Sequence, residues 1–129
     1  MTAENLIVKQ TQSTPAVNGD ATTGTLTMSG DSYPENSYEF FSPVIAWLEN
    51  LLGLPGFAIR LELHLMYMNT SSVKAMMDIF DLMEDAFADR NADLAVTWYF
   101  DPRNERVVEM IEEFREDCSF PFDIVAETS

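Results

Sequence analysis

Residues 61–78, LELHLMYMNTSSVKAMMD, contain the end of a strand, a short polar segment and the start of a helix, and this junction decides the fold. Leu61, Leu63 and Leu65 alternate with polar residues, which is the pattern of a strand with one buried face. After residues 69–72, NTSS, which we call the hinge, apolar residues recur at helical spacing. We therefore expect a buried strand up to Met68 that is followed at once by a helix.

The chain on either side of this junction alternates strand and helix patterns. Near the N-terminus, the extended segments 13–17 and 24–28 flank Asn18-Gly19-Asp20, which predicts a hairpin turn because Asn and Gly tolerate positive φ. The other predicted elements are a helix over 40–52 that the GLPG cluster at 53–56 ends, a strand over 57–68, a helix over 73–87, a loop at 90–93, a strand over 94–100, a helix around 107–114 that ends at 117–119, and a tail strand within 120–127.

Two prolines bear on where the helices begin. Pro43 lies inside the first helical repeat, so that helix either kinks there or starts after a cap at Ser42. Asp101 and Pro102 precede the third repeat and supply an N-cap and a proline for its first position. The element order predicts one small α/β domain over residues 1–129: a mixed β-sheet of about five strands, with an N-terminal hairpin and parallel strands, packed with three α-helices.

Composition narrows the class of protein. The chain has 129 residues, is 47% hydrophobic and carries a net charge of −15, from 22 acidic and 7 basic residues. This charge repels nucleic acid and anionic membrane surfaces, so we expect neither as a partner. The sequence has no apolar run long enough to cross a bilayer and no signal-peptide pattern at its start, and Cys118 is its only cysteine. We expect a cytoplasmic protein.

The chain offers little material for catalysis. Its single histidine, His64, lies in mid-strand without a second His or Cys at metal-ligand spacing, and a hydrogen-bonded strand histidine is the expected role. Cys118 follows Glu116 and Asp117, which raise the pKa of a thiol, so we expect an inert packing residue. The sequence has no glycine-rich phosphate loop, and we expect no enzyme activity, cofactor or metal. A small hydrolase that uses His64 or the acidic clusters is a remote alternative.

The hinge has two possible roles. Hydroxyls at a helix start commonly cap the free N–H groups there, and on frequency alone this is the more common case. A phosphate in the same place is stabilised by those N–H groups and by the helix dipole. Phosphorylation of Thr70 would add a charge of about −1.5 to −2 at the rim of the sheet.

A strand, a Ser/Thr hinge and a helix on a small mixed sheet resemble STAS-type anti-anti-sigma proteins. A second resemblance is more specific and covers nearly the whole chain, because five motifs together are similar to the SiaC family of bacterial biofilm-regulating phosphoproteins. These motifs are TQSTP at 11–15, GDSYPENSYEFF at 30–41, NTSSVKAMMDIFDLME at 69–84, NER at 104–106 and EEFREDCSFPF at 112–122.

The SiaC resemblance implies a switch. The unphosphorylated protein would bind and activate a diguanylate cyclase, which raises cyclic di-GMP and promotes biofilm formation. A dedicated kinase would phosphorylate Thr70, and a PP2C-type phosphatase would reverse this. Asn69, Ser71 and Ser72 surround that position; we expect the two serines to form the cap, and the amides of residues 71–73 with Lys74 to hold the phosphate. An anti-anti-sigma protein that binds an anti-sigma kinase is the alternative.

The partner surface is expected beside the hinge. It comprises the turn of Tyr33, Pro34, Glu35 and Asn36, together with Tyr67 at the strand end, because polar loop residues beside aromatic ones suit recognition. The alternative is that this turn only caps the first helix.

Overall fold

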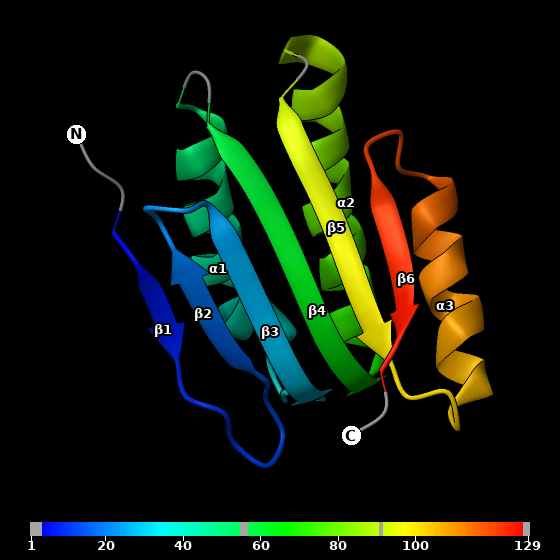
Figure 1. Cartoon of the computed structure of the whole chain (residues 1–129). Helices are drawn as coiled ribbons and strands as arrows, with labels where there is room; N and C mark the ends of the chain where they lie inside the picture. Colours follow the sequence, from blue (N-terminus) through cyan, green and yellow to red (C-terminus); the bar gives the residue numbers. More distant parts are fainter. Residues whose placement is uncertain (1–3, 55–56, 91, 128–129) are drawn as a thin grey trace.

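A computed structural model describes residues 4–54, 57–90 and 92–127. Within them, six strands form one sheet and three helices pack against it (Figure 1). The elements in chain order are β1 (Leu6–Val8), β2 (Ala16–Asp20), β3 (Thr25–Ser32), α1 (Ser37–Leu52), β4 (Ala58–Met68), α2 (Thr70–Arg90), β5 (Asp93–Phe100), α3 (Glu105–Glu116) and β6 (Phe122–Ala126).

The strands lie in the sheet in the same order as in the chain. The pairs β1 to β2 and β2 to β3 are antiparallel, whereas β3, β4, β5 and β6 run parallel to one another. One helix connects the two strands of each parallel pair. Each right-handed crossover adds the next strand on the same side of the previous one, and this places all three helices on one face of the sheet. The carboxyl ends of the four parallel strands therefore share one edge of the sheet.

The expected α/β fold is confirmed, with one more strand than the five predicted. The additional strand, β1, has three residues and lies at the sheet edge, which is too short for an alternation pattern to show. The antiparallel pairing of the N-terminal strands, the parallel strands and the three helices follow the prediction, but the strand expected at 13–17 lies at residues 16–20.

The core lies between the sheet and the helices, and α1 and α2 lie behind the sheet in Figure 1. Leu61, Leu63 and Leu65 of β4 face this core and are almost fully buried. The Trp98 ring of β5 is fully buried and stacks on Phe114 of α3, with 5.5 Å between ring centroids. All three helices thus bury the same sheet face, and the polar residues of β4, such as Glu62, point to the other.

The predicted turn at residues 18–20 is wrong. Asn18-Gly19-Asp20 is the second half of β2, and the chain reverses at residues 21–24, where Asp20 accepts a hydrogen bond from the Thr22 N–H at 2.9 Å and Gly24 has a φ of 75°. Gly19 is in the sequence for another reason: a Cβ there would lie 2.8 Å from the Trp47 ring. Close packing, not turn geometry, requires this glycine.

Of the two alternatives for the first helix, the structure supports the one in which Pro43 lies inside it: α1 begins at Ser37 with Asn36 as its N-cap, and Ser42 is not its cap. The predicted start of the third helix is wrong. Helix α3 begins at Glu105 with Asn104 as its N-cap position. The local Asp101 to Arg103 contact explains this, because Asp101 accepts hydrogen bonds from the Arg103 backbone and guanidinium within a turn that precedes the helix.

Helix α1 ends at Leu52 with Gly53 as its C-cap, as the predicted cluster required. Pro55 and Gly56 of that cluster, and Asn91 of the predicted loop, lie outside the described residues. Among the described helices, none combines the length and the hydropathy that spanning a membrane requires.

The Gly19 contact yields a test of this packing. We expect Gly19→Ala to lower the free energy of unfolding by about 1–3 kcal/mol, because the new methyl group overpacks Trp47. Gly53→Ala is the matched control: its φ is −77° and its nearest atoms are 3.5 Å away, so stability stays the same or rises by up to about 1 kcal/mol. Urea unfolding measures both. Equal losses in the two variants would contradict the assignment of Gly19 to a packed strand.

Candidate functional site

The hinge lies at the carboxyl ends of the parallel strands, where a single residue connects β4 to α2. Strand β4 ends at Met68 and α2 begins at Thr70, which leaves Asn69 as the whole connection. The Asn69 N–H donates to the Ser32 carbonyl oxygen at 2.9 Å, and this bond fixes the connection to the end of β3.

Asn69 caps helix α2. Its side-chain oxygen accepts from the Ser72 N–H at 2.9 Å, and its backbone oxygen accepts from the Val73 N–H at 3.0 Å. Its side-chain nitrogen donates to the Pro34 carbonyl oxygen at 3.3 Å. The expectation that Ser71 and Ser72 form the cap is therefore wrong, because a cap residue must stand before the first helical residue and both serines lie inside the helix.

The two serines instead make side-chain pairs with residues far away in the chain. The Ser72 and Ser32 hydroxyls are 2.8 Å apart, and both residues are fully buried. The Ser71 hydroxyl lies 2.6 Å from that of Ser37, in the first turn of α1. These pairs tie the start of α2 to the end of β3 and to the start of α1. Sequence reasoning missed Ser32 and Ser37 as partners, although both lie in the 30–41 motif.

Thr70 is the hinge hydroxyl that remains available. It is the first residue of α2, its side chain is exposed, and within the described residues its hydroxyl makes no hydrogen bond. Because Asn69 already uses the amides of Ser72 and Val73, the amides left for a phosphate are those of Thr70 and Ser71. Lys74 is exposed one turn further along the same side of the helix.

The turn that was expected to bind a partner lies against the hinge. The Tyr33 and Tyr67 rings meet edge to face, with centroids 5.5 Å apart, and both side chains are partly exposed. Pro34 is buried and acts through its carbonyl oxygen, Glu35 is exposed, and Asn36 caps α1. The turn therefore has the capping role of the alternative and also supports the hinge.

Large exposed hydrophobic side chains gather on the segments that meet at the hinge. Besides Tyr33 and Tyr67, they are Tyr38 of α1, which is 85% exposed, Met66 of β4 and Met77 of α2. Met66 follows the buried Leu65 and so points to the open face of the sheet, and Met77 lies two turns into α2. We therefore call only the Tyr33 and Tyr67 pair the hinge surface. Two other large hydrophobics, Ile7 and Val125, are exposed on the edge strands β1 and β6. Sequence reasoning missed Tyr38, Met66 and Met77, because the tertiary fold decides which hydrophobic side chains stay exposed.

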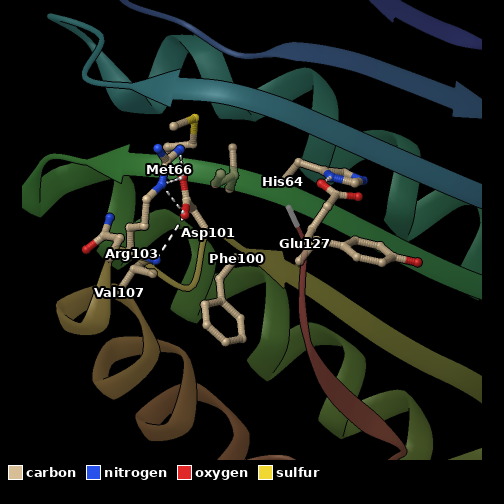
Figure 2. A pocket seen from close by; sticks show the side chains of 10 residues that line it. His64, Met66, Phe100, Asp101, Arg103, Val107 and Glu127 are labelled. Atoms are coloured by element: carbon tan, nitrogen blue, oxygen red, sulfur yellow. Dashed lines mark hydrogen bonds and ion pairs between the residues drawn. The ribbon is translucent and has the colours of Figure 1, made fainter. Parts of the chain in front are cut away.

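A pocket of about 270 Å³ lies at the same edge of the sheet (Figure 2). His64 and Glu127 lie on one side, with the imidazole Nδ1 2.9 Å from the carboxylate and the ring stacked on Tyr99. Asp101 and Arg103 pair on the other side, and the Arg103 hydrogen bond is the main cause that lowers the pKa of Asp101 to about 2. His64 is thus a hydrogen-bonded strand histidine, as expected, and the charges of Asp101 and Arg103 offset each other.

Cys118 has the expected unreactive surroundings. It is half-buried, and its thiol donates to the Phe114 carbonyl oxygen at 3.3 Å. Burial raises the pKa of the thiol to about 12, and Glu84, Asp117 and Asp81 add to the effect. Across residues 4–54, 57–90 and 92–127, no group of three His, Cys, Asp or Glu side chains is placed to hold a metal ion.

Comparison with known proteins places the chain among regulatory phosphoproteins, since the family model described as SiaC family regulatory phosphoprotein matches residues 8–127. An uncharacterized protein of Pseudomonas aeruginosa strain UCBPP-PA14 is 55% identical over 122 residues, which cover 95% of this chain and 96% of that protein. The chain belongs to the SiaC family, as its motifs predicted.

Solved structures agree with this assignment. Apo-SiaC from Pseudomonas aeruginosa is 53% identical, with a TM-score of 0.91 over 95% of this chain and 99% of that one. SiaC from the same organism, solved in complex with the diguanylate cyclase SiaD as its activator, is 55% identical with a TM-score of 0.91 over the same shares of the two chains.

Substitution at Asn69 tests the cap. We expect Asn69→Ala to lower the free energy of unfolding by about 1–2 kcal/mol, because the Ser72 N–H and the Pro34 carbonyl lose their partner. Thr70→Ala, one residue further, should change it by less than about 0.5 kcal/mol, because this side chain is exposed. Chemical denaturation measures both. A loss for Thr70→Ala as large as that for Asn69→Ala would show that Thr70 is part of the cap.

Thiol reactivity tests the surroundings of Cys118. The raised pKa leaves the thiol protonated at about pH 8, so iodoacetamide should modify the folded chain much more slowly than the unfolded chain. The rate in the folded chain should keep rising as the pH approaches 12, whereas that of the unfolded chain levels off near its ordinary pKa of about 9. Equal rates at about pH 8 would contradict the burial of the thiol.

Proposed function

We propose that this chain is a non-enzymatic regulatory protein whose unphosphorylated form binds and activates a diguanylate cyclase. A partner kinase phosphorylates Thr70 and ends the binding, and a PP2C-type phosphatase restores it, all in the cytoplasm. Two observations support this proposal: the family is one of regulatory phosphoproteins, and a 55% identical SiaC has been crystallised with the cyclase SiaD that it activates. That complex also favours a cyclase over an anti-sigma kinase as the partner.

The observation that supports the proposal most strongly is that the Thr70 hydroxyl makes no hydrogen bond within the described residues. It is exposed at the first position of α2, beside the hinge surface, while the hydroxyls of Ser71 and Ser72 are paired. A kinase can therefore reach it without unfolding the helix, and a partner that covers the hinge surface covers it too. Kinase and cyclase compete for one place on the molecule.

A phosphate at Thr70 acts on the fold and on the partner in opposite ways. Within the chain, the free amides of Thr70 and Ser71, the dipole of α2 and the Lys74 ammonium all favour a dianion at this position. A partner that fits the bare hinge meets a hydrated charge of about −1.5 to −2 in place of a methyl and a hydroxyl. The modified chain keeps its fold and loses its partner.

The hinge surface supplies the contact area for this partner. Tyr33 and Tyr67 form an exposed aromatic pair, and Tyr38, Met66 and Met77 are further exposed hydrophobic side chains on the neighbouring elements. Aromatic and methionine side chains are enriched at the centres of interfaces. Exposed Glu35 and Asn36 lie on the turn beside them, and the net charge of −15 suits a partner with a basic rim.

Introduction of a negative charge at residue 70 tests the proposal. We expect Thr70→Glu to weaken binding to a diguanylate cyclase by at least about tenfold and to abolish its activation, since a fixed negative charge replaces the hydroxyl. Thr70→Ala should bind and activate like the native chain. SiaD of Pseudomonas aeruginosa serves as the partner, with binding measured by calorimetry and activation by cyclic di-GMP formation.

Thr22→Glu is the matched control, because Thr22 is exposed in the turn between β2 and β3, at the opposite edge of the sheet from the hinge. It adds the same charge and should leave binding unchanged. If Thr70→Glu activates the cyclase as well as the native chain does, the proposal is wrong. If Thr22→Glu weakens binding equally, net charge and not the hinge controls the partner.

A further inference from the structure

The hydroxyls of Thr70, Ser71 and Ser72 differ in exposure and in hydrogen bonding, and therefore in how readily a kinase could phosphorylate them. Ser72 is fully buried and paired with Ser32. Ser71 is exposed, as Thr70 is, but its hydroxyl lies 2.6 Å from that of Ser37. Exposure alone therefore does not explain why phosphorylation would select Thr70 and pass over Ser71.

The contacts of Ser71 define the direction of its hydrogen bonds. Its hydroxyl donates to the side-chain oxygen of Asn69 at 3.3 Å, and that oxygen can only accept. The proton between Ser37 and Ser71 must then come from Ser37, so Ser71 accepts at one lone pair and gives its own proton to Asn69. Within the described residues, the Thr70 hydroxyl has no such partners.

We propose that Ser71 is a latent second phosphorylation site and that Ser37 masks it, so that Thr70 alone is modified. The inference rests on the proposed function, because it takes the kinase from there. In the transfer, the hydroxyl oxygen bonds to the γ-phosphorus of ATP, the bond from that phosphorus to ADP breaks, and the hydroxyl proton passes to a base of the kinase. Ser71 is less suited to this step than Thr70 while Ser37 engages one of its two lone pairs and Asn69 holds its proton.

The mask depends on where α1 begins. Ser37 is the first residue of α1, which Asn36 caps, and it is buried. Its hydroxyl is thus held against Ser71 by the helix start and not by the hinge itself. Removal of this one oxygen opens Ser71 and leaves Thr70, Asn69 and the hinge surface in place.

The test is phosphosite mapping of variants in Pseudomonas aeruginosa without its own SiaC, because a 55% identical member of this phosphoprotein family comes from that organism. Tandem mass spectrometry should find phosphate on Thr70 of the native chain. In Ser37→Ala, the ratio of phosphate on Ser71 to that on Thr70 should rise about tenfold, the usual effect of one lost hydrogen bond. In Ser37→Ala with Thr70→Ala, Ser71 should carry the phosphate, and a further Ser71→Ala change should remove it.

Ser32→Ala is the matched control. It frees the hydroxyl of Ser72 in the same chemical way, but Ser72 is fully buried and should stay unmodified. Circular dichroism melts of each variant establish that the fold is retained. Phosphate on Ser72 of a folded Ser32→Ala chain would mean that burial does not protect the hinge, and would overturn the inference.

The remaining outcomes separate the inference from the proposed function. Phosphate on Thr70 of a folded Ser37→Ala chain with none on Ser71 would overturn the mask and leave the proposed function standing. Equal phosphate on Ser71 and Thr70 of the native chain would do the same. Absence of phosphate from Thr70 in the native chain would overturn the proposed function and the inference with it.

Discussion

The side chain of Asn69 is the constraint on which the rest of the hinge depends. Its oxygen accepts from the Ser72 amide and the Ser71 hydroxyl, and its nitrogen donates to the Pro34 carbonyl. Its backbone bonds to Ser32 and Val73 in addition. A single residue thus ends β4, starts α2 and holds the turn before α1, which is why a strand can pass into a helix here without a loop.

This arrangement explains how the Thr70 hydroxyl can be exposed on a well-connected support. Parallel strands place their carboxyl ends at one edge, and the segments that follow β3 and β4 meet there. The buried pair of Ser32 and Ser72 fastens the hinge to the sheet, and the partly buried pair of Ser37 and Ser71 fastens it to α1. The Thr70 side chain takes part neither in these two serine pairs nor in the Asn69 cap. A charge at this exposed position would therefore leave the packing of the core unchanged.

The periodic parts of the structure could be predicted from the sequence, because strands such as β4 and helices such as α2 bury one face. Tyr33 and Tyr67 could be expected to share a surface beside the hinge, and the structure brings their rings together. The failures have two causes. Distant contacts override the local signals of Asn18-Gly19 and of the hinge serines, because Gly19 packs against the Trp47 ring and the hydroxyls of Ser71 and Ser72 pair with those of Ser37 and Ser32. At Asp101-Pro102 the cause is local, since Asp101 bonds to Arg103 in a turn that precedes α3.

The strands lie in the sheet in the order of the chain, and this has a consequence for folding during synthesis. As the chain leaves the ribosome, each new strand finds the strand it pairs with already complete, and each helix covers the sheet that has just grown beneath it. No strand has to wait for a later one to be inserted between neighbours. The hinge forms at the midpoint of this growth, so its hydrogen bonds to β3 and α1 can be made before β5, α3 and β6 are added to the sheet.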